Sequence, residues 1–290
     1  MNEFVIMTDS SCDLPSEIAK EFQISVLPLS VSIKNNEYEN YLDERDIKFT
    51  EFYKMLREGE PAKTSAVNVD AFLNEMEKYL KMGKDVLCLS FSSGLSNTYN
   101  AAKIASKELS EKYSERKVYT VDTLCASLGQ GMLVYLAAKE KQAGKTIDEV
   151  RDFCENNKLH ICHMFTVDDL HHLKRGGRIS SAVAIFGTVL HIKPVLHVDN
   201  EGHLVNISKA RGRRDSLESL VNYMEKNVIN PEEQTIFISH GDCYEDAEYV
   251  ADLVKKRMNV KDVIINYVGP VIGAHSGPGT IALFYYGKQR

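Results

Sequence analysis

The feature that most constrains the fold is a pattern of apolar strand, polar loop and helix that recurs through the first half of the chain. Val86–Leu89 is an apolar strand that ends in the polar stretch Ser90–Thr98, after which a helix-forming segment begins. The same order occurs at Phe4–Met7 and at Lys117–Val121. Strands separated by helices predict a parallel sheet, and such sheets bind ligands at the carboxyl ends of their strands, where these polar loops fall.

The polar stretch Ser90–Thr98 predicts an anion site. Five of its nine residues carry hydroxyls, Ser92 and Ser93 among them, and Gly94 allows the backbone to approach a ligand closely. The start of the following helix presents unpaired N–H groups and the positive end of a dipole, which favour a carboxylate or phosphate. Any one of these hydroxyls would also serve as an ordinary N-cap, so that alternative stays open.

The pattern changes near residue 158, and two domains are predicted. Residues 1–158 are expected to form a parallel α/β/α sandwich, and residues 159–290 an α+β domain of two layers. The hydrophobic content of 43% is sufficient for a core in each domain. The first strands of the second domain are predicted at Ile161–Val167, Lys193–Val198 and His203–Ser208, the last two joined by a hairpin turn at Asp199–Gly202.

Three other segments carry expectations that a structure can test. Ile24–Ile33 is predicted as one strand, with Pro28 at an edge or a bend. Thr64 and Ser65 lie between two predicted helices, and their hydroxyls either cap the helix that begins near Val69 or join the serine-rich loop around one ligand. The glycine-rich segment between the last two predicted strands is expected to be a loop.

Composition and charge exclude several classes of protein. No apolar run reaches the ~18 residues of a membrane span, and no basic leader precedes the first strand, so a soluble cytoplasmic protein is expected. The net charge of −6 argues against non-specific binding of nucleic acid, which depends on clustered basic residues. The six cysteines contain no CxxC pair and are expected to be free thiols.

The common nucleotide and metal motifs are missing from the sequence. Gly277–Ala282 matches GxGxxA as text, but it runs into strand residues instead of opening a helix, so it is rejected as a dinucleotide fingerprint. No Gly-Lys pair has the upstream glycine of a P-loop, and no GxSxG elbow occurs. Alternation along a strand points the histidines of His160–His163 to opposite faces, so no metal site is predicted.

Seven stretches, in the same order along almost the whole chain, resemble those of a known family. They are Thr8–Ser10, Thr64-Ser65, Ser92–Ser96, Phe165–Leu170, Lys174–Ser180, Lys193–Leu196 and Gly269–His275. In these stretches the chain resembles the DegV family of bacterial fatty-acid-binding proteins. The resemblance implies a two-domain protein that holds one long-chain fatty acid in a tunnel between its domains and needs no other cofactor.

The resemblance also implies which residues touch the ligand. Neutral donors, namely hydroxyls of the first domain and a histidine of the second, are expected to orient the carboxylate. For the tail, the apolar stretch Ala182–Ile192 cannot be a one-sided surface helix, so it either lines the tunnel or belongs to the core. The expected carboxylate residues are Thr64, Ser65, Ser92, Ser93 and His275, and the expected tunnel residues are Ile185, Phe186, Val189 and Ile272.

By the same resemblance, the protein would be the acyl-carrying subunit of a fatty acid kinase in phospholipid metabolism. It would present the carboxylate to a separate ATP-binding subunit that makes the acyl phosphate. Transient contact with a membrane surface is compatible with that role. Arg175 and Arg178 flank a predicted tight turn and, with Arg211 and Arg213, offer this partner a basic docking face in an otherwise acidic chain. A solvated basic surface is the alternative.

Two departures and one alternative function remain. The family commonly has Gln-Pro where this chain has Ala66-Val67, which is expected to alter acyl preference, and commonly Gly where it has Asn97, which tolerates a left-handed backbone. The alternative is a stand-alone hydrolase or phosphatase of small anions that uses Asp9, Ser93 and His275. Against it, no local signal ties a base to a nucleophile.

Overall fold

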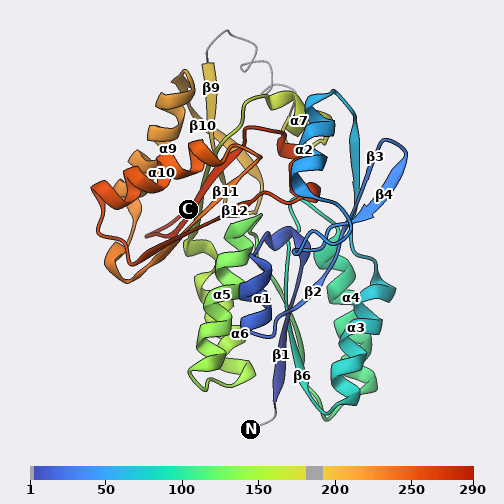
Figure 1. Cartoon of the computed structure of the whole chain (residues 1–290). Coiled ribbons are helices and arrows are strands. Elements are labelled where there is room, and N and C mark those ends of the chain that lie inside the picture. The colour runs from blue at the N-terminus through green and yellow to red at the C-terminus, as the bar shows by residue number, and fades with distance from the viewer. Residues whose placement is uncertain (1–2, 181–191) are drawn as a thin grey trace.

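The computed structural model describes residues 3–180 and 192–290, and its strands form three sheets (Figure 1). The first sheet is fully parallel, with strand order β2-β1-β6-β7, and confirms the predicted α/β class. The strands are β1 (Phe4–Asp9), β2 (Ser25–Leu27), β6 (Asp85–Ser90) and β7 (Val118–Asp122). The two central strands, β1 and β6, are buried along their whole length, as a parallel sheet covered by helices on both faces requires.

Helices cover both faces of this parallel sheet. Figure 1 shows α3 and α4 on one side and α1, α5 and α6 on the other. Asn68 caps α3 by accepting a hydrogen bond from the Ala71 N–H, and Thr146 begins α6 with a capping box. The helices are α1 (Ser16–Glu21), α3 (Val69–Lys81), α4 (Thr98–Lys112), α5 (Leu128–Gln142) and α6 (Ile147–Asn157).

The second half of the chain builds a six-stranded mixed sheet in the order β10-β9-β8-β13-β11-β12. Only β11 and β12 run parallel; the other neighbours are antiparallel. Two helices, α9 and α10, pack on one face of it. The strands are β8 (Ile161–Thr166), β9 (Ile192–Val198), β10 (Leu204–Arg211), β11 (Thr235–His240), β12 (Asp262–Tyr267) and β13 (Ile281–Tyr286); the helices are α7 (Leu170–Arg175), α9 (Arg213–Asn227) and α10 (Tyr244–Arg257).

The prediction of a single strand over Ile24–Ile33 is wrong. The chain breaks at Pro28-Leu29, because Pro28 has no N–H for the sheet and the Leu29 N–H donates to the Ser10 hydroxyl at 3.0 Å. The residues beyond the break form a separate antiparallel sheet of order β4-β3-β5, with α2 following β4. Its elements are β3 (Ser30–Ile33), β4 (Asn36–Glu39), β5 (Ala62–Ser65) and α2 (Phe49–Arg57).

The glycine-rich segment before β13 is not only a loop, because it contains the short helix α11 (Pro270–Ser276). Pro270 is the first helical residue, where a missing N–H costs nothing. Gly277, with φ of 80°, ends the helix in a backbone conformation that residues with a side chain rarely adopt. α11 packs against α2, α7, β3 and β5, so it lies between elements of both halves of the chain.

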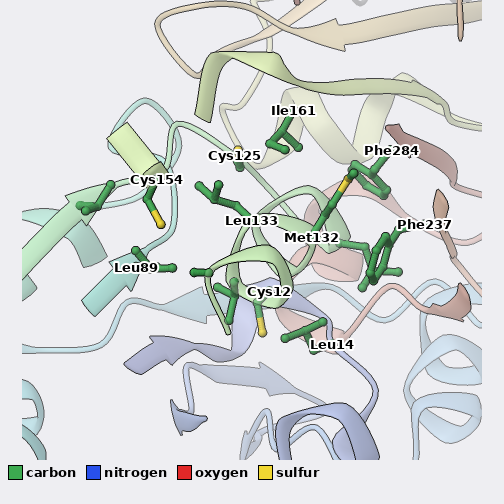
Figure 2. Close-up of a cluster of buried hydrophobic side chains, with 14 of the residues drawn as sticks. Cys12, Leu14, Leu89, Cys125, Met132, Leu133, Cys154, Ile161, Phe237 and Phe284 are labelled. Carbon is green, nitrogen blue, oxygen red and sulfur yellow. The ribbon is translucent and has the colours of Figure 1, made fainter. Parts of the chain in front are cut away.

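One hydrophobic core spans both large sheets. Helix α5 contributes Met132 and Leu133, which pack in one cluster with Leu89 of β6 and with Phe237 and Phe284 of the mixed sheet (Figure 2). All five side chains are at most 2% exposed. The predicted division near residue 158 therefore separates the strands of the two large sheets, whereas the core is continuous across it.

The six cysteines are free thiols, five of them buried and Cys243 half-buried. Burial raises the pKa of the Cys88 thiol to about 12. Over residues 3–180 and 192–290, no helix combines the length and the apolar character that a membrane crossing requires.

We predict that Gly131→Ala destabilises the protein by about 1–3 kcal/mol, as overpacking in a core does. A methyl group at Gly131 in α5 would lie 2.5 Å from the backbone oxygen of Cys12, which cannot swing away like a side chain. Without that contact, glycine to alanine inside a helix would stabilise by about 0.5–1 kcal/mol. Thermal unfolding measures whether Gly131→Ala lowers or raises the stability of the protein. Gln142→Ala, at the exposed end of α5, is the control. A raised melting temperature for Gly131→Ala would contradict the packing described.

Candidate functional site

A cavity of about 280 Å³ lies between the two halves of the chain, and most of its wall is apolar. Residues from the parallel sheet's loops, from β5, from α11 and from the mixed sheet all contribute to the wall. The apolar side chains are Leu29, Ala66, Phe91, Leu95, Ala126, Phe165, Leu173, Val198, Leu204, Val268, Val271, Ile272, Ala282 and Phe284; the polar ones are Thr64, Ser65, Ser96, Asn97, Ser127, His163, Arg178, Ser239, His275, Ser276 and Thr280.

Thr64 and His275 meet at the wall of this cavity. The Thr64 hydroxyl lies 2.8 Å from Nε2 of His275, although the two residues are 211 positions apart. Because Asn68 caps α3, Thr64 and Ser65 do not act as caps, and β5 instead carries both to the cavity, Ser65 at an exposed position. Of the five predicted carboxylate residues, three therefore line this one cavity: Thr64, Ser65 and His275.

The His275 imidazole is held neutral. Burial, and then the positive charge of Arg178, lowers the pKa of His275 to about 4. Its Nδ1 is buried and has no hydrogen-bond partner among the described residues. Only a glycine fits beside it, since a methyl group at Gly176 would lie 2.2 Å from Nδ1. A neutral imidazole can accept a hydrogen bond at one nitrogen and donate at the other, which suits an oxygen-bearing ligand.

Arg178 lines the cavity near His275. The sequence pattern instead predicts Arg178 on a docking face for a partner. The guanidinium is half-buried and donates to the Leu95 carbonyl through Nε at 3.2 Å and Nη2 at 3.0 Å. It also bonds to the Gly176 carbonyl. Burial lowers the pKa of Arg178. Among the described lining residues, the cavity wall therefore includes the cationic side chain of Arg178 beside the predicted neutral donors Thr64, Ser65 and His275.

Ser92 and Ser93 do not line the cavity. The buried Ser92 hydroxyl donates to the Gly202 carbonyl at 2.9 Å and so joins its loop to the turn between β9 and β10. Ser93 is exposed, and its N–H donates to the Asp122 carboxylate at 3.1 Å. The backbone donors of the predicted anion loop are thus used within the protein, and the loop contributes Ser96 and Asn97 to the cavity wall instead.

The residues of the alternative hydrolase are not assembled into a catalytic set. The buried Asp9 carboxylate accepts hydrogen bonds from the N–H groups of Ser11 at 3.1 Å and Phe91 at 2.9 Å, so it holds two loops together. Ser93 bonds to Asp122, and His275 bonds to Thr64. Within the described ranges, no group of three or more His, Cys, Asp and Glu side chains could hold a metal ion.

The predicted tunnel residues are placed only in part. Ile272 of α11 lines the cavity, whereas Ile185, Phe186 and Val189 lie outside the described residues. Ser127 and Ser239 line the cavity but were not predicted, because neither stands in a motif. The signal that could have found them is their position: Ser127 directly precedes α5, and Ser239 lies near the end of β11.

The remaining arginines of the predicted docking face differ in their surroundings. Arg175 and Arg211 are exposed, and Nη2 of Arg175 lies 2.8 Å from the His172 ring. Arg213 is half-buried and paired with two carboxylates, Asp246 at 2.7 Å and Asp168 at 3.5 Å. The charge of Arg213 is therefore largely satisfied inside the protein, which leaves Arg175 and Arg211 as the accessible members of the set.

Comparisons with known proteins give one consistent family. The model of the DegV family, described as uncharacterised, matches residues 3–288. A DegV domain-containing protein of Clostridium perfringens is 50% identical over 290 residues, which cover 100% of this chain and 99% of that protein. Among solved structures, a DegV family protein of Thermus thermophilus described as fatty acid binding is similar with a TM-score of 0.89 and 28% identity, covering 98% of this chain and 99% of that one. A DegV lipid-binding protein of Thermotoga maritima has a TM-score of 0.85 and 30% identity, with 99% of each chain covered.

We predict that His275 makes the protein less stable in mild acid. The pKa of His275 is about 4 in the folded protein and about 6.5 when unfolded, so between these values the unfolded chain binds more protons. The free energy of unfolding should therefore fall as the pH falls from 6.5 towards 4. His275→Gln removes this effect, so from pH 7.5 to pH 5 the wild type should lose about 2 kcal/mol more than the variant. Urea unfolding at the two pH values measures it, and parallel losses would contradict a neutral buried imidazole.

Proposed function

The chain belongs to the DegV family, and we propose that it binds a long-chain fatty acid in the interdomain cavity and presents the carboxylate to a separate kinase. The observation that carries the proposal is a mostly apolar cavity whose wall includes hydroxyls, a neutral histidine and an arginine. Structures of the family from Thermus thermophilus and Thermotoga maritima, described as fatty acid binding and lipid binding, support it.

The apolar wall supplies the affinity in this proposal. Burying one methylene contributes roughly 0.8 kcal/mol, so a chain of about 14 carbons contributes on the order of 10 kcal/mol before the costs of association. The side chains that would cover the tail include Phe165, Leu173 and Ile272. The polar groups then have to orient the carboxylate, because the tail already accounts for most of the binding energy.

The carboxylate is held by Thr64, Ser65, His275 and Arg178 in this proposal. Arg178 supplies a positive charge at a half-buried site, where a charge-assisted hydrogen bond is stronger than a neutral one. The carboxylate would compete with the Leu95 carbonyl for the guanidinium, which limits how firmly the anion is held. Ser92 and Ser93 leave the proposed set, since neither lines the cavity.

The kinase step needs chemistry that this chain's sequence does not supply. No P-loop occurs in it, so a partner subunit would bind ATP. One carboxylate oxygen attacks the γ-phosphorus, the bond from that phosphorus to the bridging oxygen of the β-phosphate breaks, and ADP leaves with the electron pair. The products are acyl phosphate and ADP. The residues of this chain fix the carboxylate and keep the tail out of water.

The direct test of the ligand is extraction of the purified protein with organic solvent followed by mass spectrometry. We expect a fatty acid in near-stoichiometric amount. Titration of the delipidated protein with stearic acid and with palmitic acid then measures affinity. No extracted lipid together with no binding of either acid would overturn the proposed function, and hydrolysis of a small anionic ester by the isolated protein would favour the alternative enzyme.

We predict that Ile272→Trp weakens binding of stearic acid at least tenfold and shifts the preference to shorter chains. Ile272 lines the cavity, so an indole there would occupy space that the tail needs. Ile104→Trp is the matched control, because Ile104 lies on α4 and is 55% exposed. Titration with acids of graded length measures the effect. Unchanged length preference in a folded Ile272→Trp protein would place the tail elsewhere.

We predict that reversing Arg175 and Arg211 to Glu leaves fatty-acid affinity unchanged and lowers kinase-dependent acyl phosphate formation at least tenfold. Both side chains are exposed, and positive charge would steer an acidic partner. Lys107→Glu, an exposed charge reversal on α4, is the control. For the wild type, affinity for the partner should fall as salt shortens the Debye length below ~10 Å. If the double variant still supports normal acyl phosphate formation, these arginines are only a solvated basic surface.

A further inference from the structure

The cavity contains a second polar group, formed by two serines from different halves of the chain. Ser127 precedes α5 and Ser239 belongs to β11, and both line the cavity. Their hydroxyl oxygens lie 3.1 Å apart. The Ser127 hydroxyl also donates to Oδ2 of Asp13 at 2.5 Å, and all three residues are at most 5% exposed. We call these three residues the serine relay.

Helix α11 separates the serine relay from His275. Oδ1 of Asp13 accepts a hydrogen bond from the N–H of Gly269 at 3.0 Å, and Gly269 is the residue from which α11 begins. His275 lies in the last turn of the same helix. Six residues at 1.5 Å each give a separation of about 9 Å along the helix axis. A ligand with its carboxylate at His275 would therefore meet the serine relay partway along its tail.

The direction of the hydrogen bonds leaves the Ser239 hydroxyl oxygen free to accept a hydrogen bond from a ligand. A hydroxyl has one proton to donate and two lone pairs that accept. When the Asp13 carboxyl is ionised, the Ser127 proton is given to Asp13, so the Ser239 hydroxyl is then the donor in the serine pair. Among the described residues the Ser239 oxygen accepts no hydrogen bond from any other group, so its lone pairs are left for a donor within the cavity.

Two further observations indicate that this arrangement is a built feature of the cavity. Ser127 has φ of 51° and ψ of −142°, a conformation that residues with side chains rarely adopt. In addition, burial raises the pKa of Asp13 to about 8. Near neutral pH the Asp13 carboxyl can therefore carry the proton itself, in which case the relay reverses and Ser239 offers its O–H to the cavity.

We propose that the serine relay recognises a hydroxyl group partway along the acyl chain, so that the cavity accepts mid-chain hydroxylated fatty acids as well as unsubstituted ones. This inference rests on the proposed function. The ligand hydroxyl donates to the Ser239 oxygen or accepts from its O–H. An unsubstituted chain passes the relay without penalty, because the serines already bond to each other. A buried ligand hydroxyl with no such partner would be strongly disfavoured.

The test compares stearic acid with three hydroxystearic acids, which carry the hydroxyl beside the carboxylate, at mid-chain and at the terminal methyl. Their affinities are measured for the delipidated wild type, Ser239→Ala and Ser106→Ala. We expect the wild type to bind the mid-chain acid about as tightly as stearic acid and at least tenfold more tightly than the acid with the terminal hydroxyl, which would have no polar partner. In Ser239→Ala the mid-chain acid should weaken about tenfold relative to stearic acid. Ser106 is a buried serine bonded to Thr120 away from the cavity, so Ser106→Ala should keep the wild-type ratio.

The outcomes separate the two proposals. If no acid binds the wild type, the proposed function fails and this inference fails with it. If stearic acid binds and the mid-chain acid is rejected at least tenfold, or if Ser239→Ala keeps the wild-type ratio, the serine relay is only a link between the domains. Should Ser239→Ala fail to fold, the positional series on the wild type decides, and equal affinities for all three hydroxystearic acids would overturn the inference.

Discussion

The packing of α5 against both large sheets is the contact on which the rest of the structure depends. Met132 and Leu133 meet Leu89 on one side and Phe237 and Phe284 on the other, all at most 2% exposed. Because close-packed protein cores do not tolerate sliding, this contact fixes the loops of the parallel sheet relative to the mixed sheet. The cavity wall is drawn from both, so its shape depends on this helix contact, together with the packing of α11 between the two halves.

The parts of the fold that the sequence predicts are those with local causes. A buried strand, a polar loop and an amphipathic helix each depend on residues close together, so the parallel sheet could be read from their order. Helix α11 could not be found by periodicity, since it has only seven residues, although Pro270 at its start and Gly277 at its end were available as signals. The break after Leu27 likewise follows from Pro28, although the sequence pattern predicts Pro28 at an edge or a bend of one continuous strand.

The structure brings some of the predicted site residues together at the cavity and shows others bonded elsewhere in the protein. The family resemblance located Thr64 and His275, which the structure brings within 2.8 Å of each other. It did not reveal that the Ser92 hydroxyl bonds to Gly202, 110 residues away, or that Arg178 turns towards the cavity. Such roles depend on contacts between distant segments, and a hydroxyl in a loop looks the same in sequence whether it binds a ligand or another loop.

A cavity whose walls come from both halves of the chain couples occupancy to folding. A ligand that binds only the folded state raises its free energy of unfolding by RT ln(1 + [L]/Kd), or about 2.7 kcal/mol at a hundredfold excess over Kd. The empty protein would then open more often and be cleaved faster by proteases that act on unfolded chains. Under the proposed function, the cellular pool of this protein would be enriched in loaded molecules by selective degradation, without any sensor of its lipid.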